Sequence, residues 1–167
     1  MYILYKRGDF LMKKKTKALI FNIALPLIVG GVSAYISRDG MESFKALAQP
    51  PLSPPAVLFP IVWTILYILM GIAAYLVSTA DTEPQESDSA LTLYAVQLGF
   101  NFFWSLFFFK LGWFYFAFIW LLILWVLIIL TIRAFGKISK TTAYLLVPYV
   151  VWVTFAAYLN LGTALLN

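Results

Sequence analysis

Long apolar runs alternate with short polar segments along the whole chain. Five runs of about 20 residues or more contain no Asp, Glu, Lys or Arg: about 18–37, 55–78, 90–109, 112–132 and 141–165. About 20 apolar residues is the length that an α-helix needs to cross the hydrocarbon core of a membrane. A transmembrane β-strand would alternate every second residue, whereas these runs are continuously apolar. The pattern predicts an all-α integral membrane protein, a five-transmembrane-helix bundle formed by a single domain over residues 18–167.

The polar segments between these runs indicate how the chain is oriented. Of the twelve Lys and Arg residues, nine lie in the basic arm 1–17 and the loop 133–140, which five spans place on one side. The remaining three lie on the opposite side. Because loops on the cytoplasmic side carry the excess of Lys and Arg, we expect a multi-pass cell-membrane protein with a cytoplasmic amino terminus.

The basic arm 1–17 precedes the first span and is treated as a separate segment. We expect it to be disordered or to lie on the membrane surface, where anionic lipids attract basic residues. Met12 is an alternative start to Met1. An alternative interpretation of the first span is a signal peptide, with a basic segment, an apolar segment and Val32-Ser33-Ala34 as the cleavage site.

The amino-acid composition excludes several classes of catalysis and of metal site. The 167 residues are 63% hydrophobic and 11% charged, with neither Cys nor His. Disulfides, thiol and imidazole catalysis, and most transition-metal sites are therefore excluded, as is haem ligation by histidine. The acidic linker 79–89 lacks the spacing and the glycine of a calcium loop, so we expect no metal site. The net charge is +5, and the Lys and Arg residues that produce it lie beside the spans. This position is typical of residues that set orientation in a membrane, so the charge is not a sign of nucleic-acid binding.

The segment from Pro50 to Gly71 organises the chain. Its prolines predict a stiff, extended connection, and Ser53 and Pro55 predict a helix start, as N-cap and first-turn residue. The preceding loop 38–54 has one candidate element, a short interfacial helix over Met41–Ala48. Within the following span, Trp63, Tyr67 and Gly71 recur every four residues and so share one helical face.

Two further spans carry polar and aromatic stripes of the same spacing. No acid, base or charged nucleophile lies inside any span, so an ion-coupled transporter is not favoured, and neither is a conventional hydrolase. The stripes permit two interpretations: hydrogen bonding between helices, or an aromatic-walled pocket for a flat hydrophobic ligand. The candidate residues on these stripes are Trp63, Tyr67, Gln97, Asn101, Trp104, Tyr149, Trp152 and Asn160. Ala156 is added as a ligand-binding candidate only by the family resemblance described below.

A different face of the third span carries the small residues Ala95 and Gly99, four positions apart. Small residues at this spacing let another helix approach closely. The face is consistent with a homodimer or with packing inside one protomer.

Three ordered motifs resemble the TspO/MBR family, also called translocator proteins, tryptophan-rich sensory proteins or peripheral-type benzodiazepine receptors. They are PPLSPPAVLFPIVWTILYILMGIA, QLGFNFFWSLFFF and LLVPYVVWVTFAAYLN. The similarity is to the bacterial type and extends over about residues 30–160.

The resemblance implies a five-helix bundle, often dimeric, that binds protoporphyrin IX, haem and other flat hydrophobic molecules in a pocket among the helices. It implies no required cofactor. The loop after the first helix would cap the pocket, and Trp63 and Trp152 would form its aromatic walls. Some bacterial members degrade protoporphyrin in light through tryptophans that match these two. The resemblance thus implies a binding and sensory role in tetrapyrrole handling, with photo-oxidative degradation or passive transport as alternatives.

Two positions depart from the family pattern. Leu52 stands where many members have a loop tryptophan, so the contact of the cap with a ligand is altered. Residues 161–167 lack the tyrosine and basic residue of the mammalian cholesterol-recognition stretch, which argues against sterol binding there.

Overall fold

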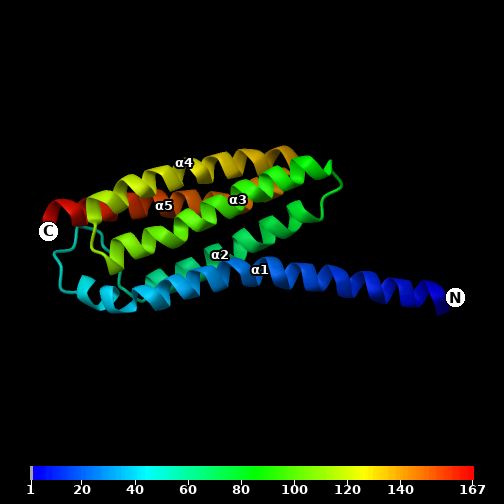
Figure 1. Ribbon diagram of the computed structural model, residues 1–167, viewed down its shortest axis with the longest axis horizontal. Coiled ribbons are helices and arrows are strands. Elements are labelled where there is room, and N and C mark those ends of the chain that lie inside the picture. Colours follow the sequence, from blue (N-terminus) through cyan, green and yellow to red (C-terminus); the bar gives the residue numbers. More distant parts are fainter. Residues whose placement is uncertain (1) are drawn as a thin grey trace.

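The computed structural model describes residues 2–167, with side chains from Lys15 onward. The described chain is helical throughout, apart from its connections (Figure 1). The helices are α1 (Tyr2–Phe44), α2 (Leu58–Ser78), α3 (Pro84–Ser105), η1 (Leu106–Lys110), α4 (Phe114–Ile138) and α5 (Lys140–Leu166). Five stretches are long enough to span a membrane, at 21 to 30 residues, with mean hydropathies from 1.3 to 2.7. The predicted five-helix membrane bundle is confirmed.

The helices pack in a closed ring in the order α1, α2, α5, α4 and α3, and α2 also contacts α3 across the interior. The first part of α1 extends beyond the bundle at the end where α3 begins (Figure 1). Its backbone is helical from Tyr2, so the expected disorder of the basic arm is wrong. A position of the arm on the membrane surface stays a prediction, and Met1 lies outside the described residues.

The first span is longer than its apolar run. Helix α1 continues through the predicted loop to Phe44, so the separate interfacial helix over Met41–Ala48 is wrong. The Phe44 ring packs on Phe108 and Phe109, with ring centroids 5.3 and 5.4 Å away. Burial of this aromatic side chain favours continuation of the helix past its polar residues.

Two helix starts also differ from the sequence prediction. Helix α2 begins at Leu58 and not at Pro55, because the Ser53 hydroxyl donates to the Pro50 carbonyl at 2.8 Å and closes a turn instead of capping the helix. Helix α3 begins inside the expected acidic linker, with Pro84 in its first turn. Proline suits that position because the first-turn N–H groups have no intrahelical partner.

The predicted break at Lys110–Gly112 is confirmed, but a π-helical turn precedes it. The Leu111 N–H donates to the Leu106 carbonyl at 3.0 Å, five residues back. Gly112 then adopts a φ of +65°, a left-handed conformation that glycine reaches without a steric penalty. The tight connection makes α3 and α4 antiparallel neighbours, as expected (Figure 1).

Helices α1 and α2 approach closely at two glycines. Gly30 is buried against the ring of Tyr67, and a Cβ on Gly71 would lie 2.6 Å from the Cα of Ile23. The gap that Gly71 leaves in the aromatic stripe of α2 is therefore filled by the backbone of α1. Small residues permit this kind of close packing between membrane helices.

Candidate ligand-binding site

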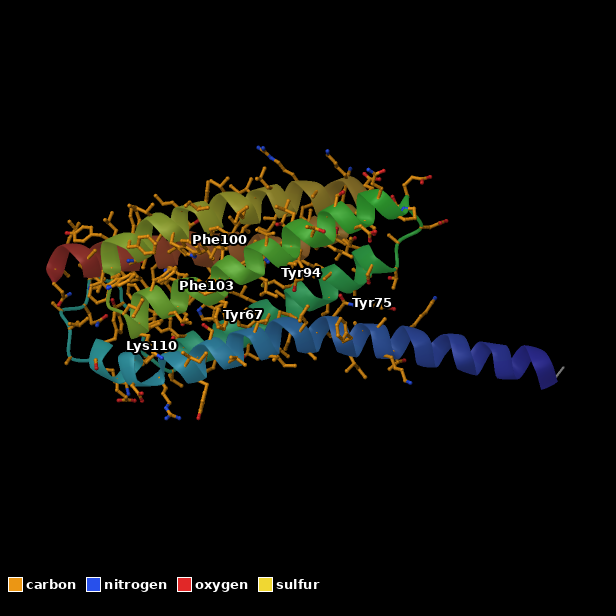
Figure 2. The ribbon with its side chains drawn as sticks, viewed as in Figure 1. Tyr67, Tyr75, Tyr94, Phe100, Phe103 and Lys110 are labelled. Carbon is orange, nitrogen blue, oxygen red and sulfur yellow. The ribbon has the colours of Figure 1, made fainter. Side chains whose placement is uncertain are left out.

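Four of the candidate residues form one buried hydrogen-bond network. The Tyr67 hydroxyl donates to Asn101 Oδ1 at 2.7 Å, Asn101 Nδ2 donates to the Tyr149 hydroxyl at 3.1 Å, and that hydroxyl donates to Gln97 Oε1 at 2.9 Å. No residue of the network is more than 9% exposed. The network joins α2, α3 and α5, and Tyr67 lies inside the bundle (Figure 2). Amides in hydrocarbon need partners, and these have found them on neighbouring helices.

A second pair of hydrogen bonds joins α3, α4 and α5 close to the connection between α3 and α4. Trp104 Nε1 donates to Asn160 Oδ1 at 3.1 Å, and Asn160 Nδ2 donates to the Phe114 carbonyl at 2.8 Å. Asn160 thereby accepts from an indole of α3 and donates to a carbonyl in the first turn of α4. Of the candidate residues, Trp104 thus has a structural partner as well as an aromatic surface.

Trp63 completes an aromatic cluster beside the network. Its ring centroid lies 5.4 Å from Tyr67, 6.3 Å from Trp104 and 6.1 Å from Tyr149. Trp63 is half-buried, whereas the other three are buried. The rings of this aromatic cluster (Trp63, Tyr67, Trp104 and Tyr149) fill the space among α2, α3 and α5.

Trp152 lies at a different place on α5. Its ring packs on Phe59 and Phe155, at centroid distances of 5.9 and 5.7 Å. It lines a groove of about 400 Å³ between α2 and α5, in which every lining side chain is apolar apart from its own indole N–H. We call this the α2/α5 groove; its lining residues are Val62, Ile65, Leu66, Pro148, Val151, Trp152 and Phe155.

The site therefore has two parts. The aromatic cluster faces the interior, and Val62, next to Trp63 in the chain, belongs to the groove. On α5, Tyr149 lies in the network and Trp152, three residues later, in the groove. Ala156 is buried one turn beyond Trp152. The structure brings eight of the nine candidates to the interior and places Trp152 at the groove.

Two buried donors have no hydrogen-bond partner among the described residues: Trp152 Nε1 and the Tyr94 hydroxyl. A buried polar group without a partner costs about 1–3 kcal/mol, so such groups are expected to meet water or a ligand. Tyr94 was not among the candidates from sequence. It lies one turn before Gln97 on the interior face of α3 (Figure 2), and its helical spacing to Gln97 and Asn101 was the signal.

The loop between α1 and α2 covers one end of the bundle. The Ala48 N–H donates to Asn167 Oδ1 at 3.0 Å, and the Tyr158 hydroxyl donates to the Pro51 carbonyl at 2.9 Å. Leu52 is 80% exposed and has a φ of +65°, a strained conformation for a residue with a side chain. Leu52 thus points away from the interior, and the loop is held by its backbone.

Comparisons with known proteins agree with this architecture. Residues 22–166 match the TspO/MBR family. The chain is 38% identical to "Tryptophan-rich protein TspO" of Chlorobaculum tepidum, over 93% of this chain and 99% of that protein. It is 33% identical to the Archaeoglobus fulgidus protein of the same name, over 89% and 96% of the two chains. It is 35% identical to the sheep "Translocator protein", over 75% of each chain. The chain belongs to the TspO/MBR family.

Proposed function

We propose that this protein binds a flat, hydrophobic ligand of the porphyrin class, such as protoporphyrin IX or haem, between α2 and α5. The ligand is received in the α2/α5 groove and packs on Trp152 and, further inside, on Trp63. The observation that carries this proposal is the side chain of Trp152. It combines an aromatic surface at an apolar groove with a buried N–H that no described group accepts.

The chemistry of the two parts suits such a ligand. The groove volume of about 400 Å³ lies in the range of small-molecule sites, which are mostly apolar with few polar groups. Aromatic side chains bury large areas of a planar ring system and add about 0.5–1.5 kcal/mol per ring pair. Trp63 is the half-buried member of the aromatic cluster, so a change of its rotamer opens the interior without breaking a hydrogen bond of the network.

The hydrogen-bond network limits what the ligand contacts. Gln97 Oε1, the Asn101 amide and the Tyr149 hydroxyl already take part in hydrogen bonds of the network, so in this state they shape the interior. The fully buried donors without a partner among the described residues are those of Trp152 and Tyr94, and carboxylate oxygens or ring nitrogens of a porphyrin are matching acceptors. Because the chain has no histidine, haem would be held by stacking and shape.

The names of the relatives point to a role. "Tryptophan-rich sensory protein" of Cereibacter sphaeroides is 35% identical over 75% of this chain. By analogy, binding in the groove would serve sensing or handling of tetrapyrroles. The indole at the groove also favours a second candidate, light-dependent degradation of the bound porphyrin with molecular oxygen as the oxidant. The illuminated porphyrin activates the oxygen, and the indole of Trp152 is the side chain of the groove that is most readily oxidised beside it.

A dark titration with protoporphyrin IX, followed by the porphyrin absorption, tests the proposal. We expect saturable binding that is about three- to tenfold weaker in Trp152→Leu, because one aromatic contact is lost. Trp125→Leu is the matched control, since Trp125 hydrogen-bonds Thr154 away from the groove. Equal, non-saturable uptake by all three proteins would mean partitioning into the micelle and would refute the proposal.

A further inference from the structure

A second groove lies at the opposite end of the molecule from the α1–α2 loop, where α3 begins and α4 ends (Figure 1). It has a volume of about 490 Å³ and is formed by the two helices and the residue before α3. We call it the α3/α4 groove; its lining residues are Glu83, Gln85, Glu86, Ser89, Ala90, Leu93, Ala134 and Lys137. None of them belongs to the candidate site or to the α2/α5 groove.

Polarity changes along the α3/α4 groove in the direction of the helices. The charged and polar residues lie in the first turns of α3 and the last turn of α4, where the spans leave the membrane. Ala90, Leu93 and Ala134 lie one to three turns further into the spans. At 1.5 Å per residue, Leu93 is about 15 Å from Glu83 along the helix. The groove thus runs from the membrane interface into the hydrocarbon.

The floor of this groove is open because its residues are small. Ala90 of α3 is buried and Ala134 of α4 is half-buried, so neither helix fills the space between them. Leu93 continues the apolar surface inward. Three apolar side chains in a row suit an acyl chain better than a hydrated solute.

The charged groups at the rim are not paired with each other. Among the described residues, the ion pairs join Arg38 to Asp39 and Lys45 to Glu42, so neither rim glutamate lies within 4 Å of Lys137. One oxygen of Glu86 accepts the Thr82 hydroxyl at 3.0 Å and the other has no partner of this kind. Two carboxylates and one ammonium group therefore face the groove. Together they can bind a ligand that carries both a positive and a negative group.

We propose that the α3/α4 groove binds an aminophospholipid, a glycerophospholipid whose headgroup carries a phosphate and a primary ammonium group. The ammonium group lies between Glu83 and Glu86 and the phosphate meets Lys137. One acyl chain follows Ala90, Leu93 and Ala134 into the membrane.

The charge balance selects this headgroup from the common ones. A phosphatidylglycerol headgroup brings only negative charge to a rim with two carboxylates. A phosphatidylcholine headgroup has the right charges, but its methylated ammonium cannot donate hydrogen bonds to them. A primary ammonium has three donors, which suits two carboxylates.

Lipid competition on the purified full chain tests the inference. The protein is exchanged into micelles holding equal amounts of phosphatidylethanolamine, phosphatidylcholine and phosphatidylglycerol with identical acyl chains, and retained lipid is counted by native mass spectrometry. We expect phosphatidylethanolamine to exceed each of the others by about twofold to fivefold, since exposed charge pairs of this kind give modest selectivity. This assay involves no porphyrin, so its outcome is independent of the proposed function.

Variants of the lining residues test whether the preference for phosphatidylethanolamine depends on the α3/α4 groove. In Glu83→Gln/Glu86→Gln, phosphatidylethanolamine and phosphatidylcholine should be retained equally, whereas Asp81→Asn, an exposed acid of the same linker outside the groove, should keep the preference. Ala134→Leu should lower retention of all three lipids by filling the floor. Equal retention by the parent protein, a preference for phosphatidylglycerol, or a preference unchanged in the double variant would each overturn the inference.

Discussion

The buried network around Asn101 gives the sharpest test of what holds the bundle together. Asn101→Leu keeps the branched shape and the number of side-chain heavy atoms but removes the acceptor of the Tyr67 hydroxyl, which is bound at 2.7 Å. Tyr149 keeps its bond to Gln97 at 2.9 Å, so one buried donor is left without a partner. Such a group costs about 1–3 kcal/mol. For a chain of this length, each kcal/mol lowers the Tm by about 2–4 °C, which predicts a fall of about 2–12 °C.

The loss of stability in Asn101→Leu should depend on the presence of the Tyr67 hydroxyl. In Tyr67→Phe/Asn101→Leu the unpaired hydroxyl is gone, so the double variant should be more stable than the sum of the two single changes predicts. Coupling energies between membrane helices average about 0.6 kcal/mol and reach about 1.7 kcal/mol. Reversible unfolding in mixed micelles measures all four proteins. Tyr75→Phe is the control, because the Tyr75 hydroxyl has no hydrogen-bond partner among the described residues and the side chain lies on the same helix (Figure 2). Strictly additive changes would refute the network as a source of stability.

Two glycine substitutions test the close contacts of α1 and of the α1–α2 loop. Gly71→Ala places a Cβ 2.6 Å from the Cα of Ile23, so we expect loss of about 1–3 kcal/mol in the same unfolding assay. Gly31→Ala, with open space around it within α1, should instead leave stability unchanged or raise it by up to about 1 kcal/mol. Gly162→Ala places a Cβ 2.6 Å from that of Pro50, so the loop should lift from α5 and be cut faster by protease, with unchanged cleavage rates arguing against a seated loop.

Much of the fold follows from the sequence because the physical signal is strong. A helix that crosses hydrocarbon must be long, apolar and free of charge, so the five spans could be located from the runs alone. The ends of the helices could not, since contacts between distant residues decide them. Phe44 extends α1 by packing on Phe108, and Ser53 closes a turn with Pro50 instead of capping α2.

The candidate site was predictable in part for a similar reason. A spacing of three or four residues places Tyr67, Gln97, Asn101 and Tyr149 on interior faces, and the structure joins them. The spacing of residues along a helix does not show which face of that helix a neighbouring helix covers. Trp152 is three residues after Tyr149, a rotation of about 60° around the helix axis, and this small difference moves its side chain from the interior to the groove.

The positions of the indoles also decide which of them a bound ligand can reach. Trp63 and Trp152 lie at the aromatic cluster and the α2/α5 groove, and Trp125 is bonded to Thr154 elsewhere. Trp113 is 54% exposed and packs on Phe107 and Phe116, outside the lining of the α2/α5 groove, so its oxidation reports on exposure. A photosensitising ligand bound between α2 and α5 should therefore oxidise a different set of tryptophans from one dissolved in the micelle.

The measurement that tests the central claim most directly is an oxidation map of the protoporphyrin IX complex. The complex is illuminated briefly, digested, and each tryptophan is quantified for oxidation by mass spectrometry, with a porphyrin-free sample as the baseline. We predict oxidation at Trp152 and Trp63 well above that at Trp113 and Trp125, in spite of the greater exposure of Trp113. Oxidation that follows exposure, with Trp113 leading and Trp152 no higher than Trp125, would contradict a ligand site between α2 and α5.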